Sequence, residues 1–141
     1  MTEKEKELVR VALKARELAY APYSHHKVGA ALLASDGTVF TGCNIENAAY
    51  GPTNCAERTA LFKAVSEGVR SFTAIAIVGG LEEAETLPIC APCGVCRQAL
   101  REFTDPKTFR VILGTNRPDI AEIYTLEELL PMSFGPENLN I

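Results

Sequence analysis

The 141-residue sequence lacks any apolar run close to the ~20 consecutive residues that a membrane-spanning helix requires. It also lacks an apolar leader, because the segment from Met1 to Glu7 is mostly charged. Internal repeats and low-complexity tracts are missing too, which excludes a solenoid and an extended linker. We therefore expect a soluble, unexported, cytoplasmic protein without membrane contacts.

Positive charge is scarce and scattered. The chain has 14 Lys and Arg against 18 Asp and Glu, for a formal net charge of −4 at pH 7. Because such a surface repels a phosphate backbone at long range, nucleic acid is not expected as a partner. The length and an ordinary composition, 47% hydrophobic and 23% charged, predict one globular catalytic domain spanning residues 1–141.

The five cysteines are an odd number, and Cys90, Cys93 and Cys96 follow one another at intervals of three. In an unexported chain this usage favours reduced thiols and a metal site over disulfides.

The hydrophobic spacing predicts helices and strands in alternation. Apolar residues at steps of three and four predict a helix over residues 3–20, ended by Pro22. Two short apolar runs, residues 28–34 and 38–43, flank Asp36-Gly37 and predict a β-hairpin. The elements expected after the hairpin are a helix over 54–65, a strand over 74–78 closed by Gly79-Gly80, a helix over 92–103 opened by Pro92, strands over 109–113 and 120–124, and a helix over 126–130 capped by Thr125. This order favours an α/β fold, a three-layer α/β/α sandwich with a mixed sheet of about five strands.

Two short motifs, each at the start of an expected helix, carry the chemistry: Cys55-Ala56-Glu57 and Pro92-Cys93-Gly94-Val95-Cys96. Cysteines three apart in a first helical turn project from one side, so Cys93 and Cys96 can bind one ion and Cys55 can supply a third thiolate. Three protein ligands leave a fourth position for water, as in catalytic rather than structural zinc sites. We therefore predict one Zn²⁺ per subunit.

The charge of this cluster also fits the expected helix starts. Three thiolates and a divalent ion sum to −1, which the positive ends of two helix dipoles stabilise. Arg58 and Arg97, which each directly follow a motif, are expected to offset the charge from around the metal, although both could be solvated surface residues.

Glu57 stands two residues after the first ligand. An open zinc lowers the pKa of bound water from about 15.7 towards about 7, and Glu57 could take a proton from that water and deliver it to a substrate. By itself, such a glutamate is more often a solvated carboxylate favoured near a helix N-terminus. The neighbouring Cys55 favours the catalytic interpretation.

Together the motifs resemble the signature of the zinc-dependent deaminases, with Cys55 where many members have histidine. More closely, the chain is similar to the small, three-cysteine cytidine deaminases, from the first helix to about Phe134. The stretches that carry this resemblance are residues 21–24, 28–32, 42–48, 54–60 and 92–98.

The resemblance implies a cytidine deaminase-like fold and an enzyme of pyrimidine salvage. The implied reaction is the zinc-dependent hydrolysis of cytidine and deoxycytidine to uridine and deoxyuridine, with release of ammonia. C4 of cytosine is a poor electrophile, so the catalyst must protonate N3 and later the departing amine. The resemblance assigns these proton transfers to Glu57.

The resemblance also assigns substrate contacts. It places Asn44 and Glu46 at the ribose, and two residues apart on a strand end they point to the same face. Turn chemistry at a strand end is the alternative for this pair. Ala56 is a further expected contact. His26 stands where the family usually has Phe against the base, and it could stack, hydrogen-bond or lie on the surface. This departure leaves larger cytosine-containing antibiotics open as substrates.

Ala49, Tyr50 and Phe134 match segments that reach a neighbouring subunit's pocket in tetrameric members. The resemblance therefore implies a homotetramer with inter-subunit active sites. A local core position is the alternative for Phe134.

Three other functions use parts of the same pattern. An iron–sulfur run matches Cys90, Cys93 and Cys96, but position 100, where the fourth cysteine belongs, is Leu100. A non-enzymatic zinc module could close its site with Cys43 or Cys90, which leaves Glu57 unexplained. A deaminase of RNA or DNA needs a basic groove that the acidic composition disfavours.

Overall fold

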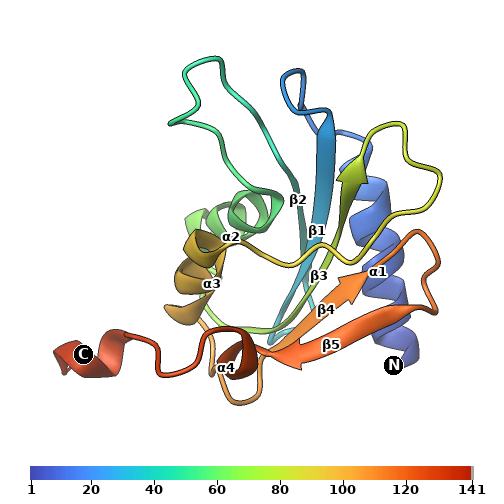
Figure 1. Cartoon of the computed structure of the whole chain (residues 1–141). Helices are drawn as coiled ribbons and strands as arrows, with labels where there is room; N and C mark the ends of the chain where they lie inside the picture. Colours follow the sequence, from blue (N-terminus) through green and yellow to red (C-terminus); the bar gives the residue numbers. More distant parts are fainter. Residues whose placement is uncertain (141) are drawn as a thin grey trace.

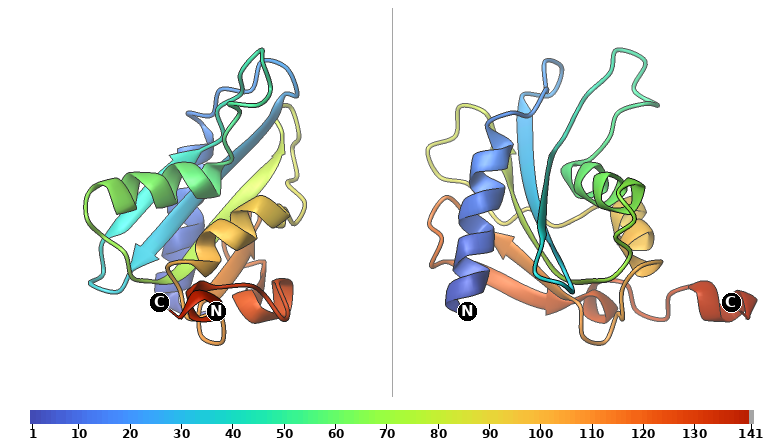
Figure 2. Two further views of the ribbon diagram at one scale, coloured as in Figure 1. Left: turned by 90° about the vertical axis from the view of Figure 1, so that its left-hand side faces the viewer. Right: turned by 180° about the vertical axis from the view of Figure 1, so that it is seen from behind.

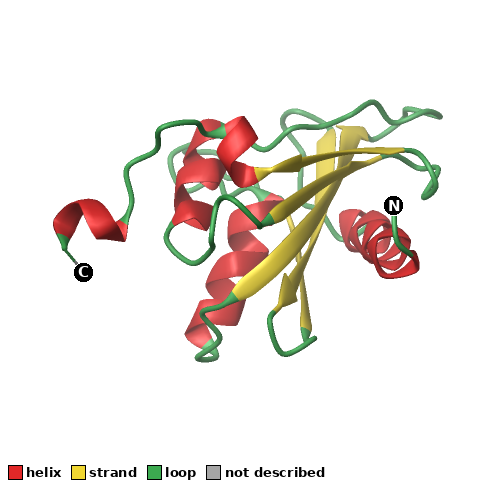
Figure 3. Cartoon of the chain, turned by 90° about the horizontal axis from the view of Figure 1, so that it is seen from below, coloured by secondary structure: helices red, strands yellow, loops and turns green. Residues whose placement is uncertain are grey.

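The computed structural model describes residues 1–140 and contains one five-stranded sheet with helices on both faces (Figure 1). The elements are α1 (Glu3–Arg16), β1 (His26–Ala34), β2 (Val39–Cys43), α2 (Ala56–Ser66), β3 (Phe72–Leu81), α3 (Gly94–Arg101), β4 (Arg110–Gly114), β5 (Ala121–Thr125), α4 (Leu126–Leu129) and a 3₁₀ helix, η1 (Pro136–Leu139). Helix α1 covers one face, whereas α2 and α3 cover the other (Figures 2 and 3). The predicted three-layer sandwich is confirmed.

The strand order is β2-β1-β3-β4-β5. Strands β3 and β4 are parallel, as the intervening α3 permits, and the other neighbours are antiparallel, so the sheet is mixed as predicted. The predicted hairpin joins β1 to β2. In its turn, Gly37 has a φ of +94°, and the Thr38 amide donates to Asp36 Oδ1 at 2.9 Å.

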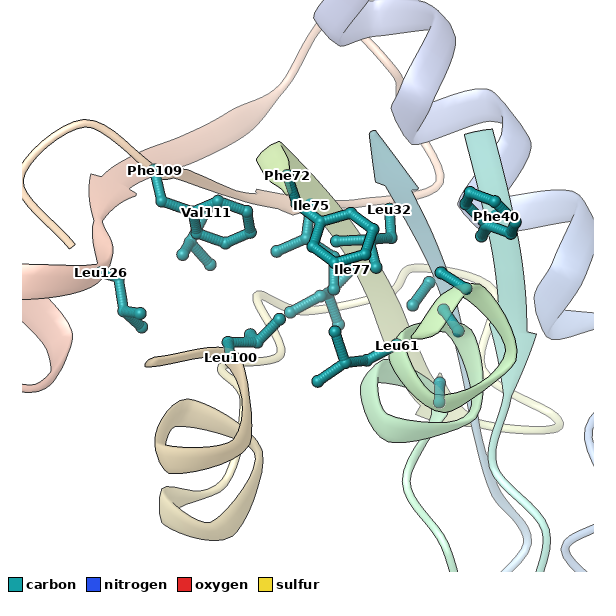
Figure 4. Close-up of a cluster of buried hydrophobic side chains, with 14 of the residues drawn as sticks. Leu32, Phe40, Leu61, Phe72, Ile75, Ile77, Leu100, Phe109, Val111 and Leu126 are labelled. Atoms are coloured by element: carbon teal, nitrogen blue, oxygen red, sulfur yellow. The ribbon is translucent and has the colours of Figure 1, made fainter. Parts of the chain in front are cut away.

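Strand β3 is buried on both faces, because its side chains alternate between two cores. Ile75 and Ile77 pack with Leu61 of α2 and Leu100 of α3 (Figure 4). The intervening residues, Ala74, Ala76 and Val78, lie with Leu8, Val9 and Ala12 of α1. Both helical layers are therefore fixed to the same central strand.

Within residues 1–140, no helix combines the length and the apolar character needed to span a lipid bilayer.

Helix α1 ends at Arg16, four residues earlier than predicted, and Pro22 does not end it. The next residues form tighter turns with hydrogen bonds across three residues, such as that from the Leu18 N–H to the Ala15 carbonyl at 3.1 Å. Tyr20 then pairs with the chain beyond β2: its N–H donates to the Asn44 carbonyl, and its carbonyl accepts from the Glu46 N–H. A long-range backbone pairing thus ends the helical path.

Gly79 and Gly80 belong to β3 instead of closing it, which is a second correction. They pair with Val28 and Lys27 of β1. A Cβ on Gly79 would lie 2.9 Å from Cys90 Sγ, and one on Gly80 would lie 2.9 Å from a methyl carbon of Leu87. The two glycines therefore do not form a turn; their lack of a side chain allows the segment before α3 to pack closely against β3.

The third predicted helix is shorter than expected and starts later. Pro92 does not open α3, because Cys93 is its N-cap and Gly94 its first residue. The predicted cap of α4 is correct, since Thr125 and Glu128 form a reciprocal capping box.

Gly42 allows β2 to pass directly beneath the first turn of α2. A Cβ there would lie 2.4 Å from the Ala56 carbonyl oxygen and 2.5 Å from the Ala60 nitrogen. We expect Gly42→Ala to displace α2 and to lower the free energy of unfolding by about 3 kcal/mol, measured by chemical denaturation. Gly51→Ala is the control, because the nearest atom to its Cβ would be 3.9 Å away. Equal stability of the two variants would contradict this contact.

Candidate metal centre and active site

Two helix N-termini bring the three predicted cysteine ligands together. Cys55 is the N-cap of α2, Cys93 is the N-cap of α3, and Cys96 lies one turn into α3. Their sulfur atoms all lie within 4.8 Å of one another. Cys96 is buried and Cys93 is exposed, so the cluster lies at the edge of the core with one side open. The positive ends of both helix dipoles face this cluster of thiols.

The spacing of these sulfurs fits tetrahedral zinc. Zinc–sulfur bonds of about 2.3 Å in a tetrahedron place neighbouring sulfurs about 3.8 Å apart. Cys55 Sγ and Cys93 Sγ are 3.8 Å apart. Three thiolates are a donor set that zinc prefers, and they leave one coordination position free for water or substrate.

The other two cysteines lie outside this cluster. In residues 1–140, the only group of three or more His, Cys, Asp or Glu side chains close enough for one metal ion is Cys55, Cys93 and Cys96. Cys43 and Cys90 therefore do not provide a closing fourth ligand. The structure also does not gather Cys90 with Cys93 and Cys96, as the iron–sulfur alternative requires.

The guanidinium of Arg58 lies against two of the sulfurs. Its Nε donates to Cys96 Sγ and its Nη2 to Cys55 Sγ, each at 3.4 Å. A fixed positive charge there offsets the negative charge that three thiolates bring to the site.

Arg97, which was also expected to offset the charge of the cluster, donates to two backbone carbonyls. Its Nε donates to the Pro92 carbonyl at 2.7 Å and its Nη1 to the Leu129 carbonyl at 2.6 Å, so its recorded partners are backbone oxygens rather than sulfurs. It ties the segment entering Cys93 to the end of α4.

A hydrogen bond between two of the thiols shifts their pKa values in opposite directions. A hydrogen bond with Cys96, together with the Arg58 charge, lowers the pKa of Cys55 to about 5, so this residue is a thiolate at neutral pH. The same hydrogen bond and burial raise the pKa of Cys96. A thiol of this kind loses its proton when a divalent ion replaces that proton as the partner.

Glu57 is the second residue of α2, and only 4% of its surface is exposed. Burial raises the pKa of its carboxyl, and the nearby Cys55 thiolate raises it further. A carboxyl whose pKa moves towards neutrality can both accept and donate a proton at physiological pH.

A cleft of about 230 Å³ runs beside this cluster. Its walls include four residues predicted to contact substrate, His26, Asn44, Glu46 and Ala56, and three from the metal centre, Cys55, Glu57 and Cys93. A second hollow, lined by Tyr23, Ser24, Glu46, Tyr50 and Thr53, adjoins the first, since both include Ser24, Glu46 and Thr53. Glu46 thus lies between the thiol cluster and the two tyrosines.

The Asn44 side chain is partly engaged by the backbone of β1. Its Oδ1 accepts from the Val28 N–H and its Nδ2 donates to the His26 carbonyl, both at 2.8 Å. One N–H and one lone pair of this amide are left for a ligand in the cleft.

The residues expected at a subunit boundary are all exposed. Tyr50 has a left-handed φ of 59° and meets Tyr23 edge to face, with ring centroids 6.3 Å apart. Ala49 and Phe134 line neither hollow. Phe134 lies on the segment after α4, which runs away from the sheet (Figure 1), and it is not a core residue.

Sequence reasoning missed several cleft residues. Ser24, Val28, Thr53, Asn54, Cys90 and Ala91 also line the cleft. Most of them directly adjoin a motif or belong to a stretch that carried the resemblance, and this proximity could have indicated that they line the cleft. Cys90 is partly buried, and burial raises the pKa of its thiol to about 11, so it remains protonated beside the cleft.

Known proteins match both the sequence and this geometry. Residues 2–113 match the family described as "Cytidine and deoxycytidylate deaminase zinc-binding region". Cytidine deaminases of Sporosarcina psychrophila and Halalkalibacterium halodurans are 53% and 54% identical over 133 residues, which cover 94% of this chain and 93% and 96% of theirs. The crystal structure of cytidine deaminase from Burkholderia pseudomallei superimposes with a TM-score of 0.80 at 50% identity, covering 95% of this chain and all of that one.

The matched segment contains all three clustered thiols and Glu57. By class, the protein is thus a zinc-binding deaminase. The chain belongs to the cytidine and deoxycytidylate deaminase family.

Proposed function

We propose that this protein catalyses the hydrolysis of cytidine and deoxycytidine to uridine and deoxyuridine, with release of ammonia. The observation that carries the proposal is the position of the buried Glu57 beside three thiols spaced for one zinc ion, on the wall of a single cleft. The names of the similar proteins support the same substrate.

The chemistry divides between metal and protein. Cys55, Cys93 and Cys96 would hold the zinc ion, which when bound would supply an activated water as the nucleophile. Glu57 would accept one proton from the attacking water and deliver it to N3 of cytosine. It would then accept the remaining proton from the new C4 hydroxyl and deliver it to the amine, which leaves as ammonia as the C4 carbonyl forms. The raised pKa of Glu57 brings proton gain and proton loss closer in free energy.

The nucleoside is held along the cleft. Ala56 is the first residue of α2, where a backbone N–H has no partner within the helix and can bind a polar edge of the base. His26 is half-buried on the cleft wall and offers a ring for stacking. The free groups of Asn44 and the Glu46 carboxylate bind the sugar hydroxyls.

The charge of the cleft favours a nucleoside over a nucleotide. Among residues 1–140, neither hollow is lined by a lysine or an arginine, while Glu46 borders both. A phosphate dianion would meet a carboxylate there without a basic partner.

We further propose that the protein is a homotetramer in which Ala49, Tyr50 and Phe134 complete a neighbouring subunit's site. Each chain would form one catalytic domain over residues 1–141, and the enzyme would act in pyrimidine salvage in the cytoplasm. The exposed Phe134 supports the shared site, because α3 anchors its segment: Gln98 Nε2 donates to the Phe134 carbonyl at 2.9 Å, and Arg101 pairs with Glu137. A fully active monomer in solution would contradict the shared site.

A substrate panel tests the choice of nucleoside. We expect kcat/KM for cytidine and deoxycytidine to exceed that for their 5′-monophosphates at least about a hundredfold, because like charges at a binding site cost several kcal/mol. The measurement is the loss of cytosine absorbance as uracil forms, at matched zinc content. Equal or faster turnover of the monophosphates would contradict the charge argument.

A further inference from the structure

The Glu46 carboxylate is held by three donors from one turn. Oε1 accepts from the Tyr23 N–H at 3.0 Å and from the Ser24 N–H at 3.1 Å. Oε2 accepts from the Ser24 hydroxyl. All three donors lie in the segment between α1 and β1, 22 or 23 residues before Glu46 in the chain. Because Glu46 lies beyond the end of β2, its orientation depends on this turn.

The Ser24 hydroxyl links Glu46 to the backbone of His26. While it donates to Glu46, its oxygen accepts from the His26 N–H at 3.0 Å. Glu46 borders both hollows, and His26 lines the one beside the thiols. The Ser24 hydroxyl is also the largest cause that lowers the pKa of Glu46, so the carboxylate stays ionised at neutral pH.

The turn leaves the Glu46 carboxylate only part of its capacity to accept hydrogen bonds. An ionised carboxylate presents about four lone-pair sites, two on each oxygen. The turn occupies three of them, both on Oε1 and one on Oε2. One site remains, on Oε2, so Glu46 can accept a hydrogen bond from one sugar hydroxyl but cannot grip a diol by itself.

We propose that Ser24 is a positioning residue for substrate recognition: it orients Glu46 so that the one free acceptor site faces a single hydroxyl of the sugar. This inference rests on the proposed deamination of nucleosides and adds a determinant of sugar selectivity to it. A second sugar hydroxyl must bind elsewhere, and the free N–H of Asn44, which lines the same cleft, is a suitable group.

The test compares Ser24→Ala with the wild-type holoenzyme on two substrates. Cytidine carries the 2′- and 3′-hydroxyls, whereas 2′,3′-dideoxycytidine lacks both and keeps only the 5′-hydroxyl, so only cytidine can offer Glu46 a 2′- or 3′-hydroxyl. We expect kcat/KM for cytidine to fall about tenfold, mainly through KM, because a hydrogen bond to a charged group loses its alignment. The value for the dideoxynucleoside should change less than about twofold, and Ser24→Thr should restore cytidine binding by retaining the hydroxyl.

Ser35→Ala is the control, because it makes the same chemical change at the far hairpin, where the Ser35 and Ser71 hydroxyls are 2.7 Å apart. It should leave kcat/KM for both substrates unchanged. An equal loss on both substrates would show a merely structural role for Ser24 and overturn the inference. Unchanged kinetics of Ser24→Ala would overturn it as well. In both cases an active wild type leaves the proposed function standing, whereas a zinc-loaded wild type inactive on both substrates overturns the proposed function together with the inference.

Discussion

Glu57→Gln is expected to retain zinc but to lower kcat for cytidine about 10³- to 10⁴-fold, the upper range for removal of a general acid–base group. The amide has nearly the same shape as the carboxyl, so the buried position stays filled. It cannot accept a proton from water or deliver one to N3 and the leaving amine. Steady-state kinetics with metal analysis of the same sample would measure both properties.

Glu67→Gln is the matched control, because Glu67 is an exposed residue at the other end of α2. It should behave as the wild type does. A Glu57→Gln variant within tenfold of wild-type kcat would contradict the role of Glu57 as the proton carrier. Loss of zinc by that variant would instead assign it a structural part in the metal site.

Cys96→Ser is expected to abolish zinc binding, from about one ion per chain to almost none, and to abolish turnover with it. Cys96 is fully buried and accepts from Arg58, so a shorter, harder oxygen ligand there is poorly placed for zinc. Metal binding and folding are coupled in such sites, so the variant should also unfold at lower temperature. Metal analysis, activity and thermal unfolding are the measurements.

Cys43→Ser and Cys90→Ser make the same exchange outside the cluster. Both should retain zinc, because neither thiol belongs to the group that the three ligand sulfurs form. Zinc lost from either control would indicate a fourth protein ligand and a closed, structural site. This outcome would contradict the open coordination position on which catalysis depends.

Local patterns predicted most of the fold and the centre of the site. The interval of three between Cys93 and Cys96 and the helix starts beside both motifs are short-range features, and they bring the sulfurs together as expected. Short apolar runs likewise predicted the strands of the central sheet. At several other positions the structure depends on a contact outside the local sequence.

Three particular cases show this limit. Helix α1 stops because Tyr20 pairs with Asn44 and Glu46. Gly79 continues β3 because it pairs with Val28 of β1, and its missing Cβ leaves room for Cys90. Arg97 donates to the Leu129 carbonyl, 32 residues away, a partner that its position beside the motif did not indicate. Propensity and spacing carry no information about such partners, which tertiary packing selects.

The substrate end depended most on resemblance. The spacing of Asn44 and Glu46 predicted one face at a strand end, but β2 ends at Cys43, and their engagement by β1 and by the turn of Ser24 could not be predicted. Those hydrogen bonds join segments 16 to 23 residues apart. They determine how many groups remain for the sugar, and that number is visible only in the folded chain.

The most direct test of the central claim is the reaction of wild-type protein with cytidine, followed before and after zinc removal by a chelator and again after zinc is restored. Zinc-dependent deamination predicts one ammonia released for each uridine formed, loss of activity with the metal, and recovery as about one zinc per chain returns. Zinc-loaded protein that leaves cytidine and deoxycytidine unchanged, or turnover that persists without metal, would contradict the account.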